Sequence, residues 1–111
     1  MSEVLTAASF QRIKRMILAR GDRQTYCNMY NANPHVEVAG FHAYLSPDVG
    51  QRNINCDPAL SDFDQLTIQD WRAGPDDTYC SARVVGNTLE YDRSRAAALQ
   101  RYFTALLALA E

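Results

Sequence analysis

The chain has 111 residues, of which 47% are hydrophobic and 22% are charged, and its net charge is −2. This length and balance fit one globular domain over 1–111 and exclude an intrinsically disordered chain. No apolar run approaches the roughly 20 residues that cross a bilayer. The first residues place an acid before the bases, which is the reverse of a secretory signal. We therefore expect a cytoplasmic protein that makes no use of a membrane.

Charge is unevenly distributed along the chain. Residues 1–23 carry five bases against two acids, a balance of +3, and residues 57–80 carry six aspartates against one arginine, a balance of −5. Such asymmetry can mark a face that binds a partner, although a solvated surface has the same pattern. A nucleic-acid binder is usually basic overall, so nucleic acid is an unlikely partner for this acidic chain.

Residues 4–20 are predicted to form the first helix. Phe10, Ile13 and Ile17 recur at helical spacing, and Gly21 can adopt the left-handed conformation that often follows a helix. The basic residues of this segment fall mostly on the side away from the apolar stripe, where they would meet solvent or a partner.

The segment 23–45 changes to β-type composition and is predicted to be a hairpin that turns at 31–34, where Pro34 cannot donate a ladder hydrogen bond. The second strand would run through 35–45. Both of its faces are largely apolar, which is typical of a central strand covered on two sides.

Residues 53–56 can form a short strand, and Asp57-Pro58 is a good start for a short helix over 57–65, although an ordered loop is the alternative. The next strand is predicted at 66–73. The turn residues at 74–77 then lead into an antiparallel partner at 78–85, and Gly86-Asn87 leads into a strand at 88–91.

The segment 92–110 is the clearest helix. Asp92 can accept hydrogen bonds from the first turn, and alanine and leucine dominate the interior. Its apolar arc covers about half the circumference, more than the roughly 100° needed to pack on one sheet. This excess favours a homodimer. The elements together predict an α+β fold, an antiparallel sheet of about five strands packed by an N-terminal and a C-terminal helix.

The order of these elements is similar to that of the small, acidic, dimeric chaperones of secretion systems. The similarity is one of element order without matching residues, and a shared fold does not carry function.

The candidate chemistry of the sequence is sparse. Cys27, Cys56 and Cys80 form no CxxC pair and are expected to be reduced, and no glycine-rich phosphate loop is present. His35 and His42 are seven residues apart and would lie on opposite faces of one strand, so they cannot share a metal from that strand. We expect neither a metal nor a cofactor.

The leading hypothesis is a non-enzymatic, protein-binding accessory protein, such as an immunity protein, a chaperone or a regulator. Tryptophan, tyrosine and arginine are favoured at protein interfaces, and the acidic segment 57–80 contains Trp71, Arg72 and Tyr79. The predicted partner-binding residues are Asp62, Asp64, Asp70, Trp71, Arg72, Asp76 and Asp77. The alternative is a small-ligand-binding or enzymatic domain with a pocket between helix and sheet, which would use His42, Tyr44 or Cys80.

Overall fold

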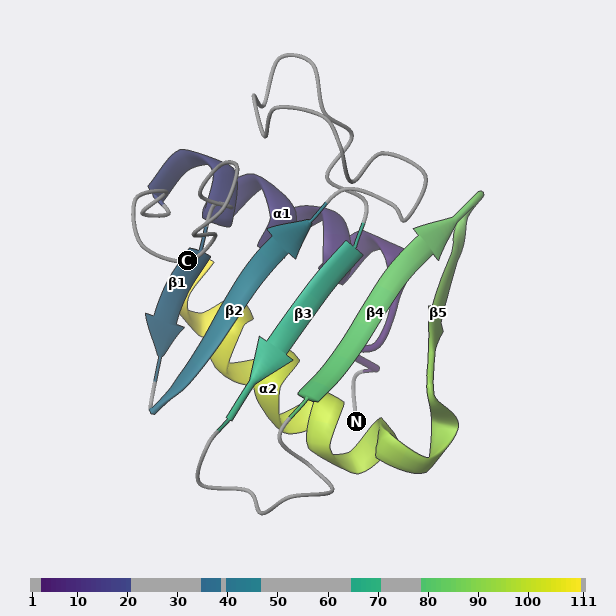
Figure 1. Cartoon of the computed structure of the whole chain (residues 1–111). Helices are drawn as coiled ribbons and strands as arrows, with labels where there is room; N and C mark the ends of the chain where they lie inside the picture. The colour runs from purple at the N-terminus through teal and green to yellow at the C-terminus, as the bar shows by residue number, and fades with distance from the viewer. Residues whose placement is uncertain (1–2, 21–34, 39, 47–64, 71–78, 111) are drawn as a thin grey trace.

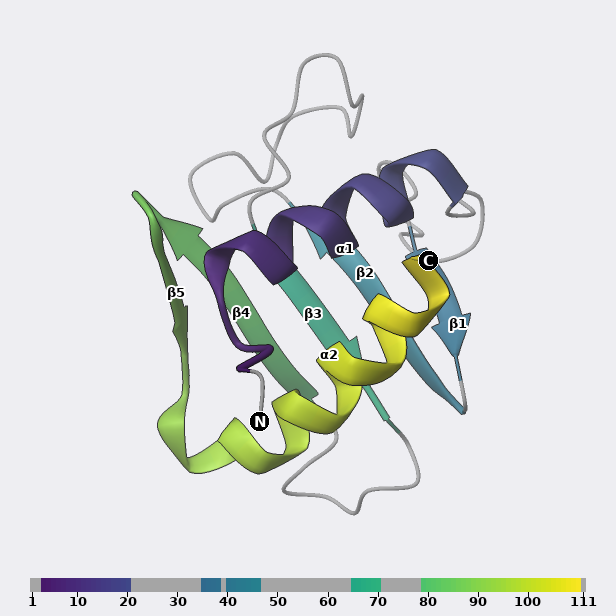
Figure 2. The same ribbon diagram turned by 180° about the vertical axis from the view of Figure 1, so that it is seen from behind.

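The computed structural model describes residues 3–20, 35–38, 40–46, 65–70 and 79–110 (Figure 1). Along the chain these form α1 (Ala7–Arg20), β1 (His35–Val38), β2 (Phe41–Ser46), β3 (Gln65–Gln69), β4 (Tyr79–Val85), β5 (Thr88–Tyr91), a 3-10 turn η3 (Arg93–Arg95) and α2 (Ala96–Ala110). The strands form one antiparallel sheet in the order β1-β2-β3-β4-β5. Both helices lie on the same face of that sheet (Figures 1 and 2). The predicted α+β class is confirmed.

Helix α1 begins at Ala7, three residues later than predicted, because Thr6 supplies its N-terminal cap. The Thr6 hydroxyl oxygen accepts a hydrogen bond from the Ser9 backbone amide at 3.1 Å. Threonine caps in this way satisfy one of the amide donors that the first helical turn leaves without a partner. The helix buries one stripe against the rest of the molecule, formed by Phe10, Ile13, Met16 and Ile17.

Helix α2 follows η3, and Asp92 is the N-terminal cap of η3, which confirms its predicted role as a cap. The Asp92 carboxylate accepts from the Ser94 backbone amide at 3.0 Å and from the Ser94 hydroxyl at 2.8 Å. These two hydrogen bonds lower the pKa of Asp92 below its usual value. The side chains that α2 buries are Leu99, Tyr102, Phe103, Leu106 and Leu107.

The wide apolar arc of α2 is used within one chain. Helix α2 packs beside α1 and also contacts the sheet, where the Tyr102 ring packs on Phe41 of β2. Two neighbours therefore cover an arc for which the prediction assumed one. Its width therefore needs no second chain.

The prediction of one strand over 35–45 is wrong. This segment is itself a hairpin, in which β1 pairs with β2 from His35 opposite Tyr44 to Val38 opposite Phe41. The turn between the two strands includes Gly40, which has φ of 90°, a conformation that glycine adopts without a steric cost. The predicted partner strand at 23–30 and the strand at 53–56 lie outside the described residues. The helix predicted at 57–65 also lies outside them except for Gln65, which begins β3.

The last two strands match their prediction. Strands β4 and β5 are joined at Gly86 and Asn87, with Val85 opposite Thr88, and Gly86 has φ of 64°. Strand β3 spans Gln65–Gln69, within one residue of the predicted start, but it ends before Asp70, which the prediction had included in the strand. The rest of that prediction, 71–73, lies outside the described residues.

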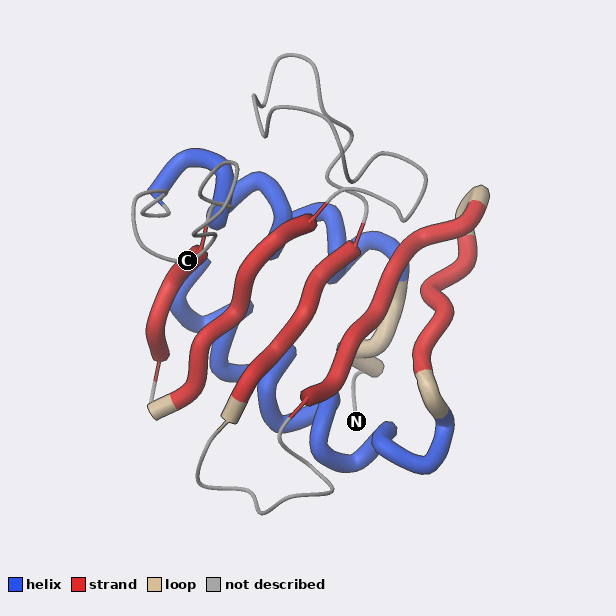
Figure 3. The backbone as a smooth tube through the Cα atoms, viewed as in Figure 1, coloured by secondary structure: helices blue, strands red, loops and turns tan. Residues whose placement is uncertain are grey.

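The core lies between the helices and one face of the sheet, which we call the inner face. Cross-strand partners from β2, β3 and β4 place Ala43, Leu45, Leu66, Ile68, Cys80 and Ala82 on this face, all buried. Figure 3 shows the two helices along one side of the five strands. Neither described helix is long and apolar enough to span a membrane.

Candidate functional site

The face of the sheet opposite the helices, which we call the outer face, is the main candidate surface. Side chains alternate between the two faces of a strand, so the residues between the inner-face positions point outward. The register aligns His42 with Gln69, Tyr44 with Thr67, Thr67 with Ser81 and Arg83 with Glu90. Side chains from all five strands therefore contribute to one continuous surface.

The centre of the outer face is uncharged and its margins are charged. Tyr44, Gln65 and Gln69 are half-buried and Ser81 is exposed, while Thr67 lies buried among them. The charged residues stand on the flanking strands. Glu37 is on β1, and Arg83 and Glu90 form an ion pair at 3.6 Å between β4 and β5.

The two histidines lie together on the outer face, which corrects the prediction that they occupy opposite faces of one strand. Strand β1 pairs antiparallel with β2, so His35 and His42 are diagonal neighbours with ring centroids 6.0 Å apart. His42 Nε2 is 3.6 Å from a Glu37 carboxylate oxygen. Among the residues that the structure describes, no three histidine, cysteine or acidic side chains are grouped so as to hold a metal ion.

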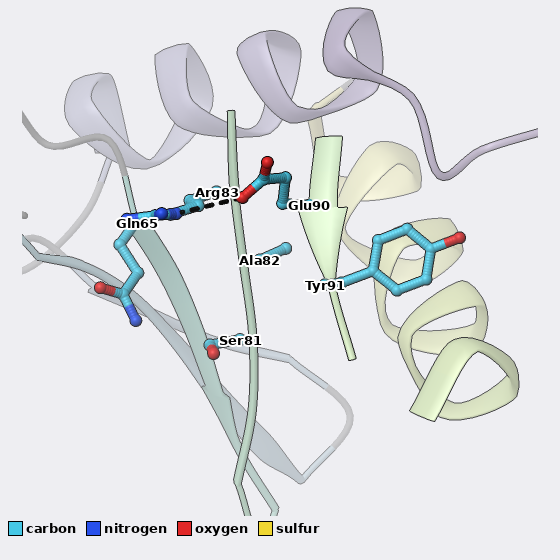
Figure 4. Close-up of a pocket in the computed structure, with 6 residues that line it drawn as sticks. All are labelled: Gln65, Ser81, Ala82, Arg83, Glu90 and Tyr91. Atoms are coloured by element: carbon cyan, nitrogen blue, oxygen red, sulfur yellow. Dashed lines mark ion pairs between the residues drawn. The ribbon is translucent and has the colours of Figure 1, made fainter. Parts of the chain in front are cut away.

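A shallow depression of about 390 Å³ lies over β3, β4 and β5 (Figure 4). The close-up shows the Arg83–Glu90 ion pair beside Gln65 and Ser81, and the Tyr91 ring pointing away from them. The polar side chains of this depression belong to the outer face, so it is a hollow in that surface.

Asp70, one of the predicted partner-binding residues, is buried on the helix side at the end of β3, with 6% of its surface exposed. It accepts a hydrogen bond from the Tyr102 hydroxyl of α2 at 3.0 Å. Burial, followed by this hydrogen bond to a negative group, raises the pKa of Tyr102 to about 12. The Tyr102 ring also packs on Phe41, with centroids 4.7 Å apart. Asp70 thus holds α2 against the sheet.

The other predicted partner-binding residues lie outside the described part of the chain. These are Asp62, Asp64, Trp71, Arg72, Asp76 and Asp77. The partner-binding role of this acidic and aromatic segment remains a prediction.

The three residues of the predicted ligand pocket do not meet. His42 and Tyr44 are on the outer face, whereas Cys80 is buried on the inner face at 2% exposure. The Cys80 sulfur lies 3.9 Å from Nη1 of Arg95. The sheet separates the Cys80 thiol from the histidine and the tyrosine.

Sequence analysis missed the uncharged centre of the outer face. Gln65, Thr67, Gln69 and Ser81 carry no catalytic or interface signal as residue types. The available signal was their alternation with the apolar residues Leu66, Ile68 and Cys80, which places them on the opposite face of the strands.

Comparison with known proteins adds no relative. No family model matches the chain, and neither a curated protein nor a solved structure is significantly similar to it.

Proposed function

We propose that this chain is a small, non-enzymatic accessory protein that binds a protein partner on the outer face of its sheet, in the manner of an immunity protein, a chaperone or a regulator. The observation that carries the proposal is the placement of both helices on the inner face, which leaves the outer face without a covering helix in the described part of the chain (Figure 1).

The distribution of side chains on the outer face supports this role. Protein interfaces are depleted of charge at their centre and polar at their rim, with tyrosine enriched. Tyr44 and the neighbouring glutamine, threonine and serine side chains form such a centre, and Glu37, Arg83 and Glu90 form such a rim.

The free edge of the sheet adds a second means of contact. Strand β5 is the last strand of the described sheet. In the β4–β5 hairpin, Thr88 and Glu90 direct their backbone groups toward β4, because Val85 opposite Thr88 closes a two-residue turn. The backbone groups of Leu89 and Tyr91 then point outward, where a strand of a partner can pair with them.

The alternative function is small-ligand binding or catalysis, and the depression over β3, β4 and β5 is the feature that favours it. A hollow with a paired arginine and glutamate beside serine and glutamine can bind a small polar molecule. This moves the alternative site from the space between helix and sheet to the outer face.

A pair of matched double variants tests the proposal. Gln65→Arg with Ser81→Arg places two bulky cations on the centre of the outer face, and Ala97→Arg with Gln100→Arg places the same two residues on α2. Affinity capture from cells of the source organism should recover a stoichiometric partner with wild type and with the α2 variant. The outer-face variant should recover at least tenfold less of this partner. Equal recovery by both variants would contradict the proposal.

A homodimer remains a separate proposal, because a symmetric pair of these chains can also use a free sheet edge. Light scattering after size-exclusion chromatography tests it directly. A mass twice that of the 12.5 kDa chain supports the dimer, and the mass of one chain at micromolar concentration contradicts it.

A further inference from the structure

The two helices enclose a groove on the side of the molecule away from the sheet. Helices α1 and α2 run side by side across the sheet (Figure 2). Two adjoining hollows, of about 330 and 440 Å³, lie along them and share Arg12. The Arg20 guanidinium donates to the carbonyl oxygen of Leu109 at 2.6 Å and so joins the C-terminal ends of the two helices. We call this feature the interhelical groove.

The two described helical segments are basic. The segments 3–20 and 92–110 contain seven basic residues against two acidic ones, Glu3 and Asp92. Asp92 accepts hydrogen bonds from Ser94. The positive charges of the first and last helices add together. Their sum is larger than the +3 balance of residues 1–23 alone.

Positive charge is concentrated at one end of the groove. Arg12, Arg15 and Arg20 line the hollow at the C-terminal end of α1, and all three side chains are exposed. At the other end lies Glu3, whose carboxylate accepts from the Leu5 backbone amide at 3.1 Å. An occupant of the groove would therefore place its acidic groups toward Arg12 and Arg15.

The floor of the groove is apolar. Met16 and Leu107 lie in it at 6% and 9% exposure, beside Ala108 and Ala110. Met16 and Leu107 are almost fully buried whereas Arg12 and Arg15 are exposed, so a convex ligand is needed to reach the two apolar side chains. A membrane is an unsuitable occupant, because proteins insert protruding apolar side chains into a bilayer, whereas Met16 and Leu107 are buried. A nucleic acid is also unsuitable, because its phosphate backbone makes no favourable contact with an apolar floor. A helix with leucines on one stripe and acids beside it satisfies both the floor and the rim.

We infer that the interhelical groove binds an acidic amphipathic helix of a protein partner, with Arg12 and Arg15 pairing its carboxylates and Met16 and Leu107 receiving its apolar side chains. This inference rests on the proposed protein-binding function and adds to it a second surface and the chemistry of the segment that the surface recognises.

A displayed library of helix-forming 20-residue peptides, selected on the full chain, tests the inference without knowledge of the natural partner. Selected peptides should be enriched in leucine at helical spacing and in aspartate or glutamate. Their affinity should fall at least tenfold for Arg12→Ala with Arg15→Ala, and fall as salt rises from 50 to 300 mM. The control is Arg93→Ala, which removes an exposed positive charge that does not line the groove and should leave the affinity unchanged.

Each other outcome overturns the inference. Peptides without acidic enrichment, or peptides that bind the double variant as well as wild type, remove the groove but leave a protein-binding role on the outer face. A library that yields no binder contradicts the inference, whereas the outer-face proposal is contradicted only by its own capture experiment. Arginine-dependent binding of polyphosphate or of phosphatidylserine vesicles, in the absence of peptide binding, assigns the groove to another class of anion.

Discussion

Replacing Tyr102 with phenylalanine tests the role that the structure gives to Asp70. The substitution keeps the ring against Phe41 and removes only the hydroxyl that donates to the Asp70 carboxylate at 3.0 Å. A hydrogen bond to a charged group contributes about 1.5–3 kcal/mol. Both side chains are at most 6% exposed, so solvent does not replace the lost contact. We expect Tyr102→Phe to lower the free energy of unfolding at pH 8 by about 2 kcal/mol.

The pH dependence of this loss is a sharper test. The pKa of Tyr102 is raised from 10.0 to about 12 in the folded chain. The unfolded chain therefore loses this proton first as the pH rises. The stabilisation is complete below pH 10 and disappears as the pH approaches 12. At about 1.4 kcal/mol per pKa unit, a shift of this size corresponds to roughly 2–3 kcal/mol.

Urea denaturation of wild type and Tyr102→Phe at pH 8 and pH 11 measures the effect. The difference between them should shrink by about 1 kcal/mol or more over this range. Tyr91→Phe is the matched control and should change stability by less than about 0.5 kcal/mol. A Tyr102→Phe variant as stable as wild type at pH 8, or a difference that is the same at both pH values, would refute the reasoning.

Three further predictions concern binding and the hairpin turn. Trp71→Ala combined with Asp76→Lys and Asp77→Lys should abolish capture of the protein partner while the circular dichroism spectrum is retained; unchanged capture removes these residues from the interface. If the ligand-binding alternative holds, a metabolite that raises the melting temperature should lose its effect with His42→Ala, and an effect that persists shows that His42 does not bind it. Gly86→Ala should lower the free energy of unfolding by about 1 kcal/mol in chemical denaturation, because Gly86 has φ of +64°. Nothing lies within 4 Å of an added Cβ, so the cost is one of backbone conformation, and Gly86→Asn should cost less. An alanine variant as stable as wild type would contradict this.

The helices were predictable because their signals are local. The Phe10, Ile13 and Ile17 spacing in α1 extends over only about two turns, and Asp92 lies directly before the turn that it caps. The first boundary was missed by three residues because Thr6, a cap through its hydroxyl, is preceded by apolar residues that continue the helical pattern.

The hairpin at 35–46 was missed because its turn has no asparagine, aspartate or proline. Gly40 fitted the alternation of one long strand, and apolar residues on both faces looked like a central strand. Once the chain turns there, His35 and His42 become neighbours across two strands. An error of one turn therefore changed the predicted positions of both histidines.

The position of Asp70 depends on a contact that the sequence does not encode locally. Its hydroxyl partner, Tyr102, is 32 residues away, and exposed aspartates far outnumber buried ones, so residue type favoured the surface. The interhelical groove was missed for the same reason, because only the packing of α1 beside α2 brings their basic residues to one side of the molecule.

Site-specific photo-cross-linking tests the central claim, that a protein partner covers the outer face of the sheet. A photoreactive amino acid would replace Ser81, which is exposed on the outer face, or Ala97, which is exposed on α2, in cells of the source organism. We predict that the Ser81 position cross-links to one protein and that the Ala97 position does not. A cross-link from Ala97 alone, or no cross-link from Ser81, would contradict the account.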